Sequence, residues 1–351
     1  MQMATGERRA KGTMRLAVAA QPTANGRYRA VLPLQELERR GHKVHWPGDP
    51  TFHTLGEGGV PSGWDVLHVQ QMHDEEALDV IERVRRAGIA VVWDTDDDIS
   101  AVTRGSEAYH RLGGRRMIRR HFKQAVAAAR TAHLVTTTNE NLAQVYRDAG
   151  VEHVHAIENY LAPQDVGHRR RRHQGIVIGI TAAGEHEPDL RKLRFGAMLD
   201  QLLERRDGVR VVAIGADLKL RSHRYTYVRP VEILDLIPAE CEFDIALAPL
   251  RDTAFNRARS NIKLKEYGAA GAMWLASPVG PYIGMGEEQG GLLVEDDDWL
   301  ATLEALLDDD ARRRTLAEHA RSWAAGETIR AGAARWQAAF RDALAHARNG
   351  G

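Results

Sequence analysis

The stretch that decides the fold is residues 243–271, which reads FDIALAPLRDTAFNRARSNIKLKEYGAAG. The apolar run at 243–248 predicts a buried strand, and Pro249 ends it. Polar residues then form a loop, and a helix is predicted over about 260–270 because Gly271 supplies a stop signal. A strand, a polar loop and a helix in this order are typical of a parallel α/β unit.

Units of the same kind extend from this stretch in both directions. Short apolar runs alternate with helical periodicity, which predicts two doubly wound domains with a hinge near residues 162–175. Ligands are expected at the carboxyl ends of the strands, facing the cleft between the domains. The other predicted strands are 15–20, 66–69, 89–93, 133–136, 176–180, 209–214, 273–276 and 291–294.

The domain limits follow from this pattern. The basic run 168–173 indicates a solvated linker, with contact to an anionic partner as the alternative. The predicted parts are a poorly ordered leader (1–13), an N-terminal domain (14–165), a linker (166–174), a C-terminal domain (175–325) and a C-terminal helix packing back on the first domain (326–351).

Composition excludes several classes of protein. A chain of 351 residues buries roughly three quarters of its unfolded surface, and 43% hydrophobic with 27% charged residues excludes wholesale disorder. Cys241 is the single cysteine, so no intramolecular disulfide forms and a reducing, cytoplasmic location is expected. Because no apolar run approaches about 18 residues and no signal-like leader opens the chain, neither a membrane span nor secretion is predicted.

The predicted helix 260–270 carries the clearest chemistry. Its N-terminus near Ser260 and Asn261 presents unpaired N–H groups, which favour a phosphate. Lys263 and Glu266 are three residues apart and share a helical face, where the cation can meet phosphate and the carboxylate can meet sugar hydroxyls. The alternative is a surface salt bridge.

This segment resembles the donor-binding region of family 4 glycosyltransferases. In that family, a strand ending in proline is followed by a glutamate, seven residues, a second glutamate and a small-residue stretch ending in glycine. Glu266 and the run to Gly271 match the second glutamate, whereas Ala258 occupies the position of the first. The resemblance implies an α/β protein of GT-B architecture, with two facing Rossmann-like domains and a UDP-, GDP- or dTDP-linked sugar as donor.

The resemblance also implies a donor site in the second domain. The loop 181–184, with His186 beyond it, resembles the loop that lies against the nucleotide diphosphate; the alternative is a plain strand-to-helix turn. Lys263 and Arg251 would counter the diphosphate charge, and Lys263 is also a predicted catalytic residue. The predicted donor-binding residues are Thr181, Gly184, His186, Arg251, Ser260, Asn261, Lys263 and Glu266.

The first domain would hold the acceptor. Tyr28 and Arg29, with the helix behind them, resemble the first loop and helix of the family's acceptor domain. Asp96 falls where many relatives carry a histidine close to the reacting sugar carbon, so Asp94 and Asp96 are predicted catalytic residues. Asp97 is predicted on the acceptor side.

Other interpretations of the acidic cluster 94–98 remain open. Carboxylates at a strand's carboxyl end can cap the next helix, bind a metal or, at Asp94, act as the nucleophile of a phosphatase. A calcium loop is excluded because Ile99 stands where the tight-turn glycine belongs and Gly105 where the bidentate glutamate belongs. No histidine set is convincing as a metal site, and His153 and His155 are read as a packed or exposed pair.

The sequence therefore predicts a glycosyltransferase, with retention of anomeric configuration and no obligatory metal implied by the resemblance. The acceptor is unidentified: a glycan, a protein, a small molecule or a modified nucleic-acid base. A basic helical face at 115–123 favours an anionic acceptor or a membrane surface, and a solvated face is the alternative. Ala258 motivates a second function, a non-catalytic partner subunit that binds nucleotide-sugar or glycan.

Overall fold

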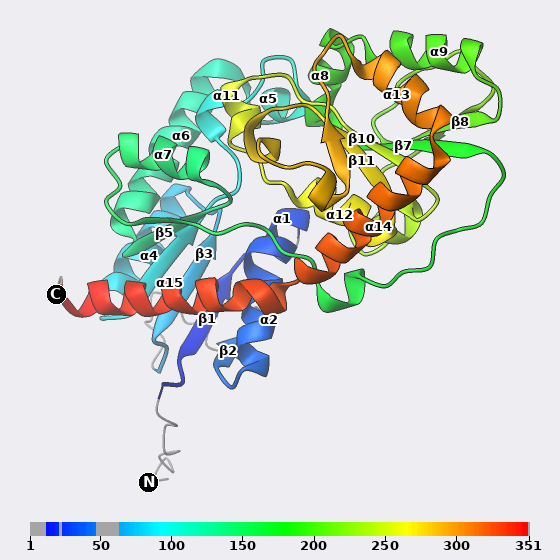
Figure 1. The fold of residues 1–351 in the computed structure, drawn as a ribbon. Helices are drawn as coiled ribbons and strands as arrows, with labels where there is room; N and C mark the ends of the chain where they lie inside the picture. Colours follow the sequence, from blue (N-terminus) through cyan, green and yellow to red (C-terminus); the bar gives the residue numbers. More distant parts are fainter. Residues whose placement is uncertain (1–11, 21–22, 47–62, 350–351) are drawn as a thin grey trace.

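Two α/β domains lie side by side in the structure, a computed structural model that describes residues 12–20, 23–46 and 63–349 (Figure 1). Each domain is built on a six-stranded sheet in which every pairing is parallel. Most of the predicted leader lies outside the described residues. Two facing Rossmann-like domains are the architecture that the sequence predicted.

The first sheet has the strand order β2-β1-β3-β4-β5-β6. Its central strands are buried along their whole length because helices cover both faces, as parallel sheets require. The strands are β1 (Arg15–Ala19), β2 (Lys43–His45), β3 (Val66–Gln70), β4 (Ala90–Asp94), β5 (Leu134–Thr137) and β6 (Val154–Ala156). The helices are α1 (Ala24–Gly26), η1 (Arg27–Val31), α2 (Leu32–Arg39), α4 (Glu75–Arg86), η2 (Ile99–Ala101), α5 (Glu107–Arg111), α6 (Gly114–Thr131), α7 (Glu140–Asp148) and η3 (Pro163–Asp165).

The second sheet has the order β12-β11-β10-β7-β8-β9. Its strands are β7 (Ile176–Ala182), β8 (Val209–Gly215), β9 (Tyr225–Val228), β10 (Ile245–Ala248), β11 (Met273–Ala276) and β12 (Gly291–Leu293). Its helices are η4 (Gly184–His186), α8 (Glu187–Lys192), α9 (Phe195–Arg205), α10 (Leu236–Glu240), α11 (Ala254–Arg257), α12 (Ile262–Ala270), η5 (Gly280–Tyr282), η6 (Glu287–Gln289), α13 (Trp299–Asp308) and α14 (Asp310–Gly326).

Helix α4 illustrates how the sequence specifies these elements. Asp74 caps its N-terminus by accepting a hydrogen bond from the Ala77 backbone N–H at 2.8 Å. Ile81 and Val84 point into the core and are fully buried. Gly88, with a φ of 77°, follows the helix end and turns the chain into β4.

The chain crosses between the domains twice, at one place. Leu161, on the outward path, pairs with Thr328 on the return path in an isolated parallel bridge. Helix α15 (Ile329–Asn349) then runs along the first domain (Figure 1). Its Trp336 and Phe340 are fully buried, and both rings meet His68 edge-on at centroid distances of 5.6 and 5.5 Å. His68 therefore packs against α15.

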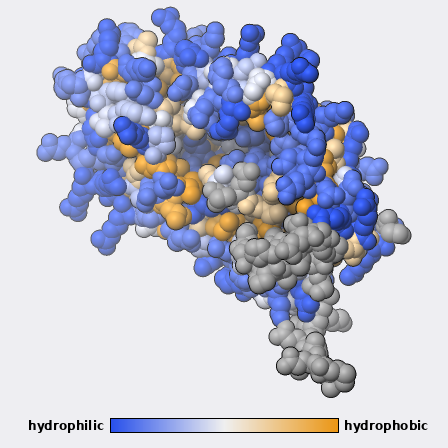
Figure 2. All heavy atoms as spheres, turned by 180° about the vertical axis from the view of Figure 1, so that it is seen from behind, coloured by the Kyte–Doolittle hydropathy of each residue, from blue (hydrophilic) through white to orange (hydrophobic). Residues whose placement is uncertain are grey.

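The basic run 168–173 is solvated, as predicted, with Arg169, Arg171 and Arg172 exposed, but it also contacts the second domain. The Arg170 guanidinium donates at 2.7 Å to the Phe243 carbonyl and to the Asp244 carboxylate, which fixes the linker on the second domain. Across the described ranges, no helix combines the length and apolar character needed to cross a membrane. The face seen in Figure 2 is mostly hydrophilic, and its hydrophobic atoms gather mainly toward the middle of the molecule.

Candidate functional site

The two domains meet at the carboxyl ends of their parallel strands. Segments that follow β1 and β4 in the first domain approach segments that follow β7 and β10 in the second, with α12 beside them. Figure 1 shows α1 of the first domain close to α12 of the second. Open α/β sheets bind their ligands at this edge. The candidate site is therefore described from the side chains of these segments.

Tyr28 and Glu266 join the two domains directly. The Tyr28 hydroxyl donates to Glu266 Oε1 at 2.6 Å, and both side chains are buried. Burial, together with the Glu266 charge, raises the pKa of Tyr28 well above its usual range, so the phenol stays protonated. Tyr28, predicted on the acceptor side, thus contacts the glutamate that is predicted to bind the donor.

Lys263 holds the start of the loop that follows β7. Its Nζ donates to the Thr181 carbonyl oxygen at 2.6 Å. Burial lowers the pKa of Lys263, although the carboxylates of Glu266 and Glu240 act in the opposite direction. The Thr181 hydroxyl in turn donates to Glu240 at 2.6 Å. Helices α10 and α12 therefore place the predicted diphosphate loop.

Glu240 makes stability depend on pH in a definite direction. Burial, and then the Glu266 charge, raises the pKa of Glu240 to about 8. The folded protein therefore binds more protons than the unfolded chain between about pH 4.5 and 8, so the free energy of unfolding falls as pH rises through this window. We expect Glu240→Gln to remove up to about 1.4 kcal/mol per pH unit of this slope. Urea unfolding at several pH values measures it, and identical slopes in parent and variant would contradict the assignment.

Asp94 and Arg29 form a buried ion pair in the first domain. Arg29 Nη2 lies 2.7 Å from Asp94 Oδ2, and neither side chain is exposed. The Thr136 hydroxyl also donates to Asp94 Oδ2, at 2.6 Å. Arg29 further donates to the Ile157 carbonyl and to Asn159 Oδ1. Because every polar atom of this pair is committed inside the core, the structure contradicts the catalytic role expected of Asp94 and the acceptor role expected of Arg29.

Asp96 and Asp97, by contrast, lie at the domain interface. Asp96 accepts a hydrogen bond from the side chain of Gln71, whose φ of 58° is unusual for a residue other than glycine. Burial, then the charges of Asp97 and Asp94, raises the pKa of Asp96 well above its usual range. Burial also raises the pKa of Asp97, which Arg259 partly offsets. These are the carboxyl groups of the acidic cluster that face the second domain.

The remaining predicted donor residues have distinct surroundings. Gly184 touches the first domain, and a Cβ at this position would have to displace the Glu107 carboxylate. His186 is buried, and burial together with the charges of Arg259 and Lys263 lowers its pKa well below the usual range, so the ring is neutral. Arg251 pairs through its Nε with Asp189 at 2.8 Å, and its role as a counter-charge to the diphosphate stays a prediction.

Ser260 and Asn261 stand at the N-terminus of α12. Ser260 Oγ accepts from the Asn159 side chain at 3.2 Å, and the Asn261 amide donates to Glu158 Oε2 at 3.3 Å. Asn261 is the N-cap residue but makes no side-chain capping bond, and its Oδ1 is buried without a partner. The N-cap side chain thus leaves the backbone N–H groups in the first turn of α12 uncapped. An anion site at this place requires such uncapped N–H groups.

The sequence reading missed several residues at this interface. The Arg259 Nη2 atom lies 3.7 Å from Glu185 Oε1. The other missed residues near this interface are Tyr282, Glu240 and Gln71. Their signals were weak, because none belongs to a recognisable spacing. Only Arg259 could have been noted, since it directly follows the Ala258 that departs from the family pattern.

A cavity of about 680 Å³ opens between the domains next to these residues. Its first-domain wall comes from α1, η1 and α5, and its second-domain wall comes from the carboxyl ends of β7 and β8 and the segment before α10. It is large enough for a nucleotide. The residues that matter most for its polarity are Thr23, Arg27, Glu107, Thr181, Gly184 and Glu232.

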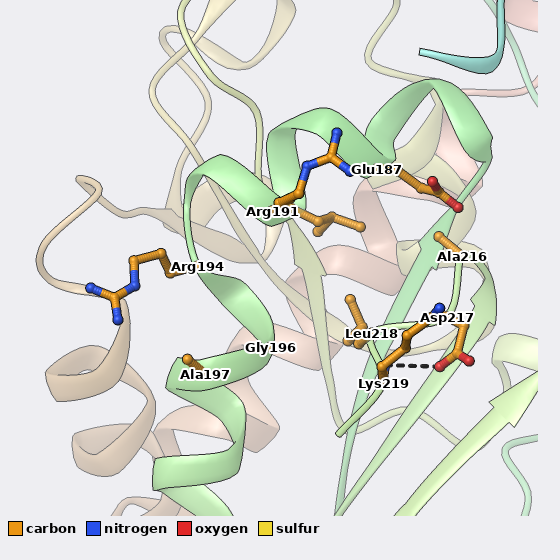
Figure 3. A pocket seen from close by; sticks show the side chains of 10 residues that line it. Glu187, Arg191, Arg194, Gly196, Ala197, Ala216, Asp217, Leu218 and Lys219 are labelled. Carbon is orange, nitrogen blue, oxygen red and sulfur yellow. Dashed lines mark hydrogen bonds between the residues drawn. The ribbon is translucent and has the colours of Figure 1, made fainter. Parts of the chain in front are cut away.

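A second cavity, of about 520 Å³, lies within the second domain at the start of α9 (Figure 3). Arg191, Arg194 and Lys219 are its cationic residues. Figure 3 shows that the Arg194 side chain points away from Leu218 and Lys219, so the cations do not converge on one point. The inter-domain cavity is therefore the better candidate site. In the described part of the chain, no group of three or more histidine, cysteine, aspartate or glutamate side chains is arranged to hold a metal ion.

Comparisons with known proteins agree with this geometry. Residues 191–337 match a family model described as glycosyl transferase-like. The chain has the GT-B fold, and its second domain carries this family match. No curated protein sequence matches it.

Solved glycosyltransferase structures share this fold at low sequence identity. HepE of Anabaena, solved with UDP and glucose, has a TM-score of 0.64 at 12% identity, covering 93% of this chain and 99% of its own. Sucrose-phosphate synthase of Thermosynechococcus elongatus has a TM-score of 0.66 at 14% identity, covering 95% of this chain and 99% of its own. An α-glucosyltransferase solved with UDP and a 13-mer DNA has a TM-score of 0.62 at 10% identity, covering 95% of this chain and 100% of its own. The predicted fold is confirmed, and the family match over residues 191–337 agrees with the predicted glycosyltransferase class; retention, acceptor and metal independence stay predictions.

Proposed function

We propose that this glycosyltransferase moves a sugar from a nucleotide-sugar donor to an acceptor held by the first domain. The observation that carries the proposal is the meeting of Lys263, Glu266 and the loop 181–186 beside the inter-domain cavity. Support comes from HepE, which was solved with UDP-glucose as well as with UDP. We place the protein in the cytoplasm, since its lone Cys241 is a buried free thiol.

The parts of the donor follow from the charges. The nucleoside lies in the 680 Å³ cavity, the diphosphate lies against the loop 181–186 and the N-terminus of α12, and Glu266 accepts from ribose or sugar hydroxyls. Lys263 supplies positive charge to the diphosphate as the glycosidic bond breaks. Asp96 and Asp97 face the reacting sugar from the first domain. Closure of the domains around the donor excludes water.

Transfer without an obligatory metal is part of the proposal. The Asp94 carboxylate is committed to Arg29 and Thr136, so an Asp94-x-Asp96 metal pair lacks one ligand. We expect turnover to persist in EDTA, while Asp96→Asn lowers kcat at least about tenfold, or roughly 1.4 kcal/mol of barrier. Donor hydrolysis measured with and without EDTA tests this. Complete loss in EDTA with recovery on Mn²⁺ or Mg²⁺ would overturn it.

Thermal-shift measurements against UDP-, GDP- and dTDP-sugars test the function itself. A ligand at a hundred times its dissociation constant stabilises the folded protein by about 2.7 kcal/mol, so the true donor should stand out. Release of nucleoside diphosphate from that donor then shows turnover. If none of the three classes stabilises the protein, the proposed function fails.

Ala258 keeps a non-catalytic partner subunit as the second candidate. Its side chain is 1% exposed and belongs to the buried cluster of the first domain, so it cannot contact the donor sugar as the family's first glutamate does. Donor binding without hydrolysis or transfer would favour this candidate. The phosphatase alternative is wrong for this structure, because the proposed nucleophile Asp94 is fully buried in its ion pair.

A further inference from the structure

The loop 257–259 is held between the two domains. Ala258 packs into the first-domain cluster that includes Trp93 and Ile99. From the second domain, Gly280 supports the loop so closely that a Cβ there would lie 2.6 Å from the Arg257 Cα. The segment that in the family carries a donor-contacting glutamate is therefore a fixed bridge between domains in this chain.

First-domain side chains fix the backbone of this loop. The Asn139 amide donates to the carbonyl oxygens of Arg257 at 3.1 Å and Arg259 at 2.7 Å. Asn141 donates to the Arg257 carbonyl as well, at 2.9 Å. The Asn139 Oδ1 atom meanwhile caps α7 by accepting from the Leu142 N–H at 2.8 Å. One asparagine thus joins the start of a first-domain helix to a second-domain loop.

This arrangement directs the Arg259 side chain into the interface. Its guanidinium is 19% exposed and lies 3.7 Å from Glu185 Oε1, too far for a good hydrogen bond. Its Nη1 atom is buried and has no partner. Burial alone would lower the pKa of Arg259, but the carboxylates of Asp97 and Glu185 raise it, so the group is a permanent cation. A half-buried cation with one unsatisfied N–H donor can bind a further anion.

The loop against which the diphosphate would lie lacks cations of its own. Residues 181–186 read TAAGEH, with no lysine or arginine, and His186 is neutral. Lys263 is one nearby cation, and its ammonium already donates to the Thr181 carbonyl. Arg259 contributes to the field at both His186 and Lys263, which places it in the same cluster. Arg259 is therefore a second cation, beside Lys263, for the two phosphates of the donor.

We propose that Arg259 is a catalytic cation that binds the departing diphosphate, and that Asn139 is the residue that positions it. The inference rests on the proposed function. In the transfer, the bond between sugar C1 and the diphosphate oxygen breaks, the acceptor oxygen bonds to C1, and the acceptor proton leaves with the diphosphate. Arg259 exchanges no proton and donates hydrogen bonds to the growing negative charge. Because Asn139 belongs to the other domain, the cation is in place only when the domains are together.

Matched variants test both roles. Arg259→Gln is expected to lower kcat for donor hydrolysis ten- to hundredfold, and Arg259→Lys is expected to restore part of it. Arg257→Gln is the control, because the Arg257 side chain is exposed and pairs with Asp252. Only its backbone carbonyl, which the substitution keeps, accepts the hydrogen bond from Asn139. Asn139→Asp keeps a capping oxygen for α7 but loses the amide donor. It should therefore lower kcat more than it changes KM, with an unchanged melting temperature.

Ligand binding supplies a readout besides activity. UDP, GDP and dTDP are each compared with uridine, guanosine and thymidine in thermal-shift titrations. Arg259→Gln should weaken binding of the diphosphate at least about tenfold and leave binding of the nucleoside unchanged. Parent-like kcat and diphosphate affinity in Arg259→Gln would overturn this inference alone. Absence of binding by the parent to all six compounds would instead refute the proposed function.

Discussion

Replacing Arg29 by methionine is expected to lower the free energy of unfolding by about 3–5 kcal/mol. The substitution leaves the Asp94 carboxylate buried without its counter-charge, and removing one partner of a buried pair costs far more than the pair itself contributes. The Arg29 guanidinium also lies 4.8 Å from the Trp336 ring centroid, so the loss extends to the contact with α15. Urea unfolding followed by circular dichroism measures the change.

Two further variants make the result specific. Arg39→Met removes an arginine whose side chain is 60% exposed and pairs with Glu36, and it should leave the free energy of unfolding nearly unchanged. Combining Arg29→Met with Asp94→Leu removes both buried charges and should recover part of the loss. A single Arg29→Met variant as stable as the parent would show that water reaches the pair and that Asp94 is available for chemistry after all.

The same pair shows where sequence reasoning ended. A carboxylate directly after a buried strand predicts a position at the rim of a cleft, and this is correct for Asp96 and Asp97. Asp94 shares that pattern, but it is the last residue of β4 and its side chain meets an arginine 65 residues away. Only the packing of η1 against the sheet decides which aspartate is neutralised in the core, and no local spacing encodes that packing.

The fold was more predictable than the site because buried parallel strands are continuous apolar runs. Some edge strands lack this signal: β2 is only three residues long and β9 reads YTYV with two exposed positions, and both were missed, whereas the edge strand β12 was predicted. The helical segment that follows β7 is divided into α8 and α9 at Arg194, whose φ of 54° breaks the helical path. Arg259 was missed for a related reason, since its role depends on where Ala258 packs in the other domain.

Glu266→Gln is expected to weaken donor binding ten- to hundredfold, or about 1.4–2.7 kcal/mol. The substitution keeps the shape of the side chain and still lets it accept from the Tyr28 hydroxyl, so the domain interface should persist. What it removes is the charge that strengthens hydrogen bonds from ribose or sugar hydroxyls. Lys263→Ala should act differently and mainly lower kcat, because its charge matters most as the diphosphate departs. Calorimetric donor affinity and steady-state kinetics separate the two effects.

Tyr28→Phe distinguishes ligand binding from a mere contact between domains. In the structure the Tyr28 hydroxyl donates a hydrogen bond of 2.6 Å to the Glu266 carboxylate. A donor hydroxyl that binds Glu266 would have to replace this bond. Removing the phenolic hydroxyl frees the carboxylate, so donor affinity should be unchanged or severalfold tighter, opposite in sign to Glu266→Gln. If both variants bound donor like the parent and lost only stability, Glu266 would be an interface residue. Because burial raises the pKa of Glu266, more of its carboxyl group is charged as pH rises, and the difference between parent and Glu266→Gln should widen with increasing pH.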